Sequence, residues 1–140
     1  MSDNCIFCKI VNGEIPSRQV YEDEMFRVIM DVSPATKGHV LILTRKHYRN
    51  IFDLANPEAS AVLVLAKKIA VAMKKSLKCE GINIIQNNEA LAGQSVFHFH
   101  LHSIPRYQND GQNMLWTPGN SEAEELESIA AAISEELAAD

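Results

Sequence analysis

The most informative segment of this chain is Gly93-Gln94-Ser95-Val96-Phe97-His98-Phe99-His100-Leu101-His102. Its last five residues place three histidines in alternation with apolar residues. Side chains of a β-strand alternate between two faces, so the three histidines would share one face about 6.6 Å apart, opposite Phe97, Phe99 and Leu101. We therefore expect a strand over Val96–Ser103 with a core face and an imidazole face. Such a face can hold a metal, carry out acid–base chemistry or supply a nucleophile.

The polar segment before the histidines favours a ligand site. Gly93 lets the backbone approach a ligand closely, while Gln94 and Ser95 offer an amide and a hydroxyl that suit phosphate oxygens. Asn87 and Asn88 add neutral donors. Ser95 could instead be a hydrolase nucleophile, but its surroundings lack the second glycine of a nucleophile elbow. The segment from 87 to 95 therefore predicts a phosphate-binding loop.

Working outward, the chain alternates short strands with two longer helices. Apolar and β-branched residues bounded by turn formers predict strands over Gln19–Glu22, Met25–Asp31, His39–Thr44 and Ile82–Gln86. Asn56-Pro57 begins a long helix, which apolar residues at helical spacing carry to about Lys78. A capping-box pattern at Ser121 begins a terminal helix over 121–140, whose apolar stripe is Leu126, Ile129, Ile133 and Leu137.

Length and charge narrow the class of protein. A chain of 140 residues fits one domain, and no apolar run reaches the length of a membrane span, so we expect a single cytoplasmic domain. The net charge of -5 belongs to the tail, because residues 121–140 carry seven acidic and no basic side chains, which leaves +2 for residues 1–120. No basic stripe with interleaved aromatic residues is present, so a nucleic-acid polymer is not an expected partner.

The cysteines favour a metal over a disulfide framework. Their number is three, and Cys5 and Cys8 form a C-x-x-C pair near the N-terminus without a βαβ pattern around it. Two thiolates and two imidazoles would complete a tetrahedral zinc site, and His39 and His47 are the histidines outside the run. Cys79 stands alone and is interpreted as a plain thiol.

Together these residues resemble the histidine triad (HIT) family of nucleotide hydrolases and transferases, over residues 4–119. The run over residues 93–102 is the most specific part of the likeness. Supporting segments are Ile6-Phe7-Cys8-Lys9-Ile10, Ile15-Pro16, Asp31-Val32-Ser33-Pro34, Gly38-His39 and Lys46-His47.

The resemblance implies an α+β fold with a five-stranded antiparallel sheet, paired into a homodimer. His100 would be the nucleophile that attacks the α-phosphorus of a purine nucleotide, with support from His102 and His39. The substrate would be bound by Phe7, Ile10, Ile29, Asp31, Val32, Asn87, Gly93, Gln94 and Ser95, with Asp31 on the ribose. In zinc-bearing members, the positions similar to Cys5, Cys8, His47 and His98 hold the metal.

Two features depart from the family pattern. Ser103 stands where an apolar residue is expected after the third histidine, and about twenty residues follow Met114–Gly119, where the phosphoramidase branch ends. In that branch the tryptophan similar to Trp116 leans toward the partner subunit's site.

The sequence leaves three hypotheses about the function of this protein. The first is an enzyme that releases a nucleoside monophosphate such as AMP from phosphoramidates, adenylated amines or dinucleoside polyphosphates. The second is a zinc-stabilised nucleotide-binding or interaction module with vestigial activity. The third is a zinc hydrolase with its metal on the three histidines of the run.

Overall fold

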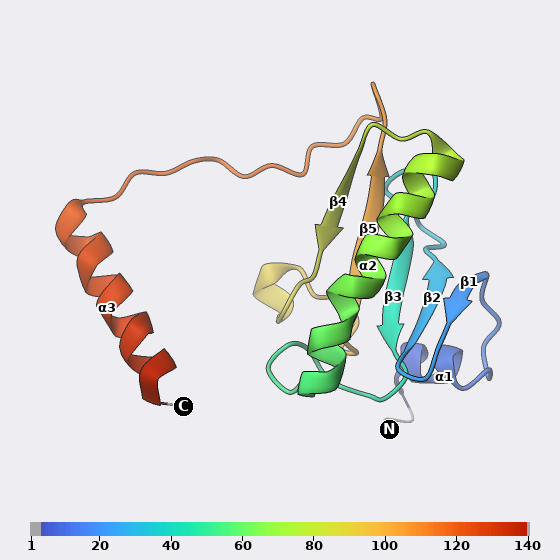
Figure 1. Ribbon diagram of the computed structural model, residues 1–140, viewed down its shortest axis with the longest axis horizontal. Helices are drawn as coiled ribbons and strands as arrows, with labels where there is room; N and C mark the ends of the chain where they lie inside the picture. The colour runs from blue at the N-terminus through green and yellow to red at the C-terminus, as the bar shows by residue number, and fades with distance from the viewer. Residues whose placement is uncertain (1–3, 140) are drawn as a thin grey trace.

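The computed structural model describes residues 4–139, which form one antiparallel sheet with helices on both faces. The elements in chain order are α1 (Ile6–Val11), β1 (Gln19–Glu22), β2 (Phe26–Met30), β3 (Val40–Thr44), α2 (Asn56–Leu77), β4 (Gly81–Ile85), the short 3₁₀ helix η1 (Ala90–Ala92), β5 (His100–Arg106) and α3 (Ala123–Ala139). The five strands lie in the order β1-β2-β3-β5-β4, and every neighbouring pair is antiparallel (Figure 1). The predicted α+β class and five-stranded sheet are confirmed.

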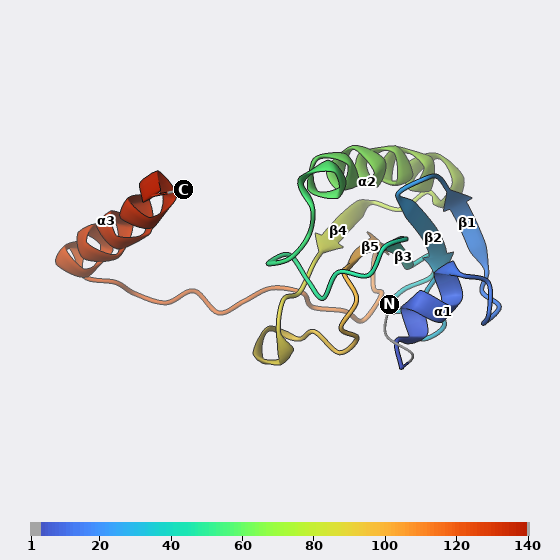
Figure 2. The ribbon, with the colours of Figure 1, turned by 90° about the horizontal axis from the view of Figure 1, so that it is seen from below.

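The two faces of the sheet have separate cores. The helix α2 covers one face, where Val28, Ile42 and Leu101 pack against its Val62 and Ala66. The short helix α1 lies on the other face, where its Phe7 and Val11 join Ile29, Leu41 and Leu43 (Figure 2). Since strand side chains alternate, residues next to each other on β3 serve different cores.

The long helix follows the sequence prediction closely. Ala55 is its N-cap and Pro57 lies in its first turn, where the missing N–H of proline costs no hydrogen bond. Its buried side chains include the predicted stripe Val62, Ala66, Ile69 and Met73. The helix ends at Leu77, and its C-cap residue Lys78 adopts a left-handed conformation. Ser103 of β5 packs beneath the helix, where its hydroxyl donates to the sulfur of Met73.

The predicted strand over Val96–Ser103 is wrong at both ends, because β5 runs from His100 to Arg106. Residues 96–98 form a bend, and the amide of Phe99 donates to the carbonyl of Tyr48 rather than to a neighbouring strand. His98 precedes β5 rather than lying in it, but its ring is on the α1 side of the sheet with those of His100 and His102, as predicted, and Phe7 of α1 contacts the rings of both His98 and His100. At the far end β5 passes through Pro105, whose missing N–H is tolerated because the pairing with β3 has already ended at Ser103.

The terminal helix is found within the predicted range, but its apolar stripe is not buried. All four stripe side chains of α3 are exposed, and none of its described residues is buried. Residues 107–122 run without regular structure from the end of β5, and α3 stands apart from the sheet in both views (Figures 1 and 2). Residue 140, which the prediction included, lies outside the described residues. No helix in the described part of the chain has the length and apolar character needed to cross a membrane.

Candidate active site and metal centre

A cavity of about 510 Å³ opens on the α1 side of the sheet. Residues from α1, the end of β2, the segment before β5, and β5 itself line it. Eight of the predicted site residues are among them: Phe7, Ile10, Ile29, Asp31, Val32, Ser95, His100 and His102. Segments far apart in the sequence therefore supply one hollow next to the histidines.

Within this cavity, the orientation of His100 leaves one ring nitrogen without a hydrogen. Its Nδ1 lies 2.7 Å from the carbonyl oxygen of His98, which can only accept, so Nδ1 carries the hydrogen of the neutral ring. The edge of the Phe7 ring holds the imidazole from the side, with ring centroids 5.0 Å apart. The Nε2 atom consequently keeps its lone pair, which is the form that a nucleophile needs.

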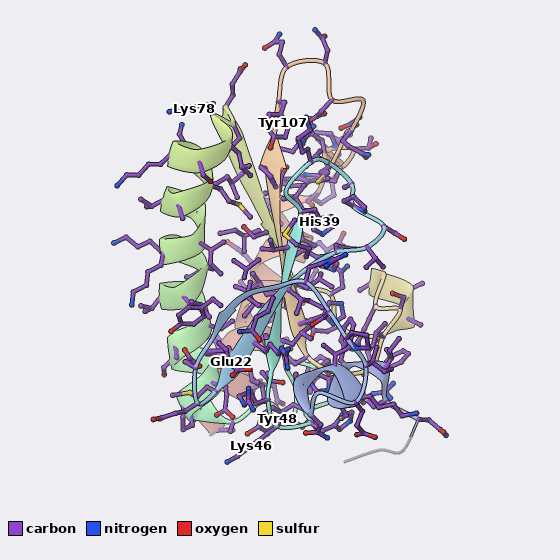
Figure 3. The ribbon with its side chains drawn as sticks, turned by 90° about the vertical axis from the view of Figure 1, so that its right-hand side faces the viewer. Glu22, His39, Lys46, Tyr48, Lys78 and Tyr107 are labelled. Atoms are coloured by element: carbon purple, nitrogen blue, oxygen red, sulfur yellow. The ribbon has the colours of Figure 1, made fainter. Side chains whose placement is uncertain are left out.

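His39 and His102 form a chain of hydrogen bonds that fixes both tautomers. The amide of Ala35 donates to His39 Nδ1 at 2.9 Å, so His39 carries its hydrogen on Nε2. That Nε2 lies 2.9 Å from His102 Nδ1 and 3.5 Å from Asp31 Oδ2. His102 Nδ1 is therefore an acceptor, and its Nε2–H is left to donate to a ligand. Figure 3 shows His39 on the side of the sheet away from α2.

The burial of these histidines favours their neutral forms. Desolvation lowers the pKa of His100 and of His39, and desolvation together with the neighbouring imidazoles lowers the pKa of His102 to about 4. The carboxylate of Asp31 opposes this effect at all three rings without cancelling it. Near pH 7 the site thus offers one unprotonated ring nitrogen and neutral N–H donors.

The wall of the cavity is mostly apolar. Phe7, Ile10 and Ile29 are buried, whereas Val32 is 91% exposed. Asp31 stands at the end of this wall, where the amide of Ser33 donates to its Oδ1. A flat apolar ring with a hydroxylated sugar attached would match this combination of surfaces.

The loop before β5 contributes in two ways. Ser95 lines the cavity, while Asn87 and Gly93 lie against each other outside the lining. Gln94 is buried, accepts from Asn50 and the Glu89 amide, and donates to the carbonyls of Arg49 and Val96. The side chain of Gln94 is thus fully used in holding the loop, so its part in binding phosphate is indirect.

Cys5, Cys8, His47 and His98 gather at one end of α1. Their donor atoms all lie within 4.8 Å of one another. The Cys5 Sγ–His98 Nδ1, Cys8 Sγ–His47 Nδ1 and His47 Nδ1–His98 Nδ1 distances are each 3.3 Å. In a tetrahedral zinc site, with Zn–N of about 2.0–2.1 Å and Zn–S of about 2.3 Å, donor atoms lie about 3.3–3.8 Å apart. The four residues therefore fit zinc.

The surroundings of His98 suit a metal ligand rather than a catalytic group. Its ring is fully buried, and burial lowers its pKa to about 4, which favours the neutral form that binds metals. Its Nε2 donates to the carbonyl of Thr44 at 2.7 Å and leaves Nδ1 free for coordination. The prediction that assigned one metal to all three histidines of the run is not supported, since His100 belongs to neither of the two described groups that could hold an ion.

Sequence reasoning missed the backbone groups that orient the histidines. The carbonyls of Thr44 and His98 and the amide of Ala35 fix the ring nitrogens, yet any residue type could supply them. The N-cap role of Cys5, whose sulfur accepts from the amide of Cys8, was also missed. No signal in the side-chain pattern could have found these contacts.

A family model described as the HIT domain matches residues 12–109. This chain belongs to the HIT family. It is 40% identical to Protein hit of Bacillus subtilis over 98% of this chain and 97% of that protein. It is 32% identical to adenosine 5'-monophosphoramidase hnt1 of Schizosaccharomyces pombe, over 96% of this chain and 98% of that protein.

Solved structures of HIT family proteins share the whole architecture. A crystal structure of a HIT family protein from Bacillus anthracis superposes with a TM-score of 0.91 and 42% identity, covering 97% of this chain and 99% of that one. That coverage extends over α3. A Zn-bound histidine triad family protein from Mycobacterium smegmatis gives a TM-score of 0.75 at 33% identity, covering 98% of both chains.

Proposed function

We propose that this protein is a nucleotide hydrolase that acts at the α-phosphate through a nucleotidyl-histidine on His100. The observation that carries the proposal is the hydrogen bond from His100 Nδ1 to the carbonyl of His98, which leaves Nε2 unprotonated in a ring that lines the cavity. Family membership and the phosphoramidase name of the fission-yeast relative support the same chemistry. The product would be a nucleoside monophosphate such as AMP.

The reaction takes two displacements. The lone pair of His100 Nε2 forms a bond to the α-phosphorus, and the bond from phosphorus to the leaving atom breaks with its electron pair on that atom. Water then attacks the same phosphorus, the P–N bond breaks with its electron pair on His100 Nε2, and the proton that water loses balances the proton that the leaving atom takes up. The Nε2–H of His102 donates to a phosphate oxygen as charge grows there, with His39 and Asp31 holding its tautomer.

The nucleoside would occupy the apolar part of the cavity. Phe7, Ile10, Ile29 and Val32 would enclose a purine, and the oxygens of Asp31 would accept from the ribose hydroxyls. Ser95 would meet the phosphate, and Asn87, Gly93 and Gln94 would shape its loop. Phosphoramidates, adenylated amines and dinucleoside polyphosphates all present such an α-phosphate.

Zinc bound by Cys5, Cys8, His47 and His98 would have a structural role. Four protein ligands close the coordination shell and leave no position for substrate. When bound, the ion would hold α1 and the segment before β5 together. It would thereby fix the His98 carbonyl on which the tautomer of His100 depends.

We also propose that the protein works as a homodimer. The edge strand β4 exposes Ile84, and Trp116 is 82% exposed and absent from the described lining of its own cavity. A second subunit would cover both features.

A turnover panel of adenosine phosphoramidate, an aminoacyl-adenylate and diadenosine polyphosphates tests the function. We expect release of AMP from at least one of them, and a loss of about three orders of magnitude or more in kcat for His100→Ala. Ser128→Ala, on α3, is the control and should retain full activity. Nucleotide binding without turnover across the panel would instead support the vestigial binding module.

A further inference from the structure

The terminal helix presents an apolar face that no other part of residues 4–139 covers. Leu126, Ile129, Ile133 and Leu137 are between 48% and 71% exposed, and α3 stands clear of the sheet in two perpendicular views (Figures 1 and 2). An isolated helix of this length is marginal in water, and most helices gain stability by burying such a stripe. The stripe therefore calls for a partner surface.

A groove of matching character lies along the flank of α2. The helix packs mainly on β3, β4 and β5 and also covers Phe26 and Val28 of β2, so the same face of the edge strand β1 is left open. Val20, Met30 and Val40 of the sheet and Ile69, Ala72, Met73 and Leu77 of α2 line a cavity of about 220 Å³ there. Ala72 is exposed at its rim.

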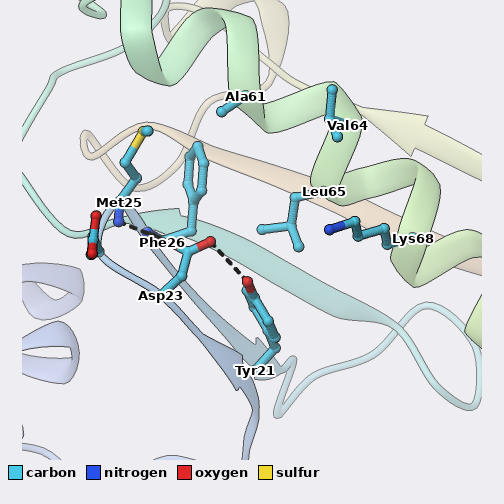
Figure 4. Close-up of a pocket in the computed structure, with 9 residues that line it drawn as sticks. Tyr21, Asp23, Met25, Phe26, Ala61, Val64, Leu65 and Lys68 are labelled. Carbon is cyan, nitrogen blue, oxygen red and sulfur yellow. Dashed lines mark hydrogen bonds between the residues drawn. The ribbon is translucent and has the colours of Figure 1, made fainter.

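A second cavity of about 490 Å³ extends this groove toward the start of α2. Figure 4 shows Ala61, Val64, Leu65 and Lys68 of α2 facing Tyr21 and Phe26 across it. The two cavities follow one another along the same flank of α2, the one over residues 61–68 and the other over residues 69–77, and residues of β1 line both. We name the two cavities together the α2–β1 groove.

Charge favours α3 as the occupant. The helix carries five acidic and no basic residues, and a rotation of about 100° per residue places Glu125 and Glu136 on one flank of its stripe and Glu127 on the other. The same geometry places Lys68 and Lys75 of α2 along the rim of the groove, and Lys68 lines its second cavity. Asp23 and Glu24, from the turn between β1 and β2, also line that cavity, so the basic border of the groove is on its α2 side. An apolar seam with a basic border matches the acidic flank of an amphipathic helix.

We propose that α3 of one subunit docks in the α2–β1 groove of a second subunit, and that the exchange is reciprocal. Residues 107–122 carry α3 past β4, whereas the groove lies beside β1 at the opposite edge of the sheet (Figure 1). A helix held on the β4 side reaches a partner across that edge rather than its own groove. The sixteen residues of the arm span up to about 50 Å when extended, which is enough to cross a subunit boundary.

This inference rests on the proposed homodimer and adds a contact made by α3, which lies outside the residues 12–109 that the HIT domain model matches. Reciprocal docking is an isologous two-fold arrangement, which closes without leaving free sites. It also covers β1, an edge strand whose four residues are all exposed. The superposition of the Bacillus anthracis structure over α3 shows the helix carried in the same way in a crystal.

Cross-linking between two differently sized versions of the chain tests the docking. One version carries Ala72→Cys and a size tag, the other carries Ile133→Cys, and they are mixed, equilibrated and treated with a short bis-maleimide. The native cysteines are buried. The parent chain, which lacks the introduced cysteines, is treated with the same reagent as a control. We expect a covalent product that joins the two versions. Ala59→Cys, an exposed alanine at the other end of α2, replaces Ala72→Cys in the matched control and should give little product.

Sedimentation of the same samples separates the possible failures. A dimer without the mixed product would overturn the docking and leave the dimer and the enzymatic proposal standing. A monomer would overturn both the docking and the dimer. A cross-link within a single chain that carries both Ala72→Cys and Ile133→Cys would place α3 in its own groove and overturn the exchange.

A charge placed in the groove gives a second, equilibrium measurement. Ala72→Glu sets a carboxylate against the acidic helix, so we expect the dimer dissociation constant to rise about tenfold or more. Ala59→Glu makes the same substitution away from the groove and should leave the constant within about twofold of the parent value. Equal dissociation constants for the two variants would contradict the docking.

Discussion

His102 depends on its neighbours for its protonation state. Burial and the adjacent imidazoles of His100 and His39 lower its pKa to about 4, and the Nε2 of His39 fixes its Nδ1 as an acceptor. A neutral His102 still has one N–H to donate, so it can serve a phosphate without carrying a charge. This property belongs to the arrangement of three rings rather than to any one residue.

The lowered pKa predicts how stability varies with pH. Between its ordinary value of 6.5 and about 4, the unfolded chain binds a proton at His102 that the folded chain does not. The free energy of unfolding should therefore fall as the pH is lowered through this range and stop responding to His102 below about 4. Denaturation of the parent and of His102→Gln at several pH values isolates the effect as the difference between two curves. Parallel curves would contradict a neutral, buried His102.

At the residue scale, the sequence predicted the members of the site better than their orientations. Alternation correctly placed the rings of His98, His100 and His102 on the α1 side of the sheet, but it did not show that His98 precedes the strand. The chain bends over residues 96–98, and the Thr44 carbonyl turns the His98 ring toward the cysteines. Hydrogen bonds to backbone carbonyls and amides set these ring orientations, and the pattern of side chains in the sequence does not reveal such bonds.

The helices and strands that carry the site differ in how well the sequence predicted them. The helix α2 and the strands β1 to β4 follow from apolar periodicity, with boundaries close to those predicted. The helix α1 was not predicted, because six residues are too few to show a helical period and its N-cap is a cysteine. That helix nevertheless supplies two of the proposed metal ligands and part of the cavity wall.

The loop between η1 and β5 has a backbone that only glycine suits. Gly93 has φ of +100°, and a Cβ there would lie 3.3 Å from the side-chain nitrogen Nδ2 of Asn87. Gly93→Ala should therefore lower the free energy of unfolding by about 1–2 kcal/mol and reduce turnover by displacing Ser95. Chemical denaturation and steady-state kinetics measure the two effects. Gly119→Ala, which meets nothing within 4 Å, is the matched control.

The proposed metal centre joins α1 to the segment before β5, so we expect loss of the metal to destabilise both segments. Cys8→Ser should reduce zinc content from about one ion per chain to near zero, and lower both the melting temperature and turnover. Cys79→Ser replaces a buried cysteine outside the cluster and should retain its zinc. Elemental analysis and thermal melting of the two variants make the comparison. Full retention of zinc by Cys8→Ser would contradict the assigned ligands.

At the scale of the whole molecule, the chain consists of a folded body and an arm that stands outside it. The charge distribution follows this division, since the acidic residues of the tail account for the negative net charge. The sequence predicted α3 and its stripe, yet it could not show that neither core of the described residues receives the stripe. An apolar stripe at helical spacing predicts that one face of a helix will be buried, but it does not predict whether the covering surface belongs to the same chain or to another.

The proposed nucleotide hydrolysis and the proposed docking of α3 are linked through the dimer. Exchange of α3 would tie each body to the arm that carries Trp116 and the acidic helix of its partner. The leaving-group side of each cavity would then be shaped partly by the other subunit. The nucleophile itself remains within one chain, because every contact that orients His100 comes from its own residues.

Trapping of the covalent intermediate tests the central claim most directly. The protein is mixed with an adenosine phosphoramidate, quenched within the first turnovers under alkaline conditions that preserve a P–N bond, digested, and analysed by tandem mass spectrometry. We predict one adenylyl group on the peptide that contains His100, located on that residue and absent from His100→Ala. An adenylyl group on a different residue, or rapid turnover without any His100 adduct under conditions that preserve a synthetic phosphohistidine standard, would contradict the account.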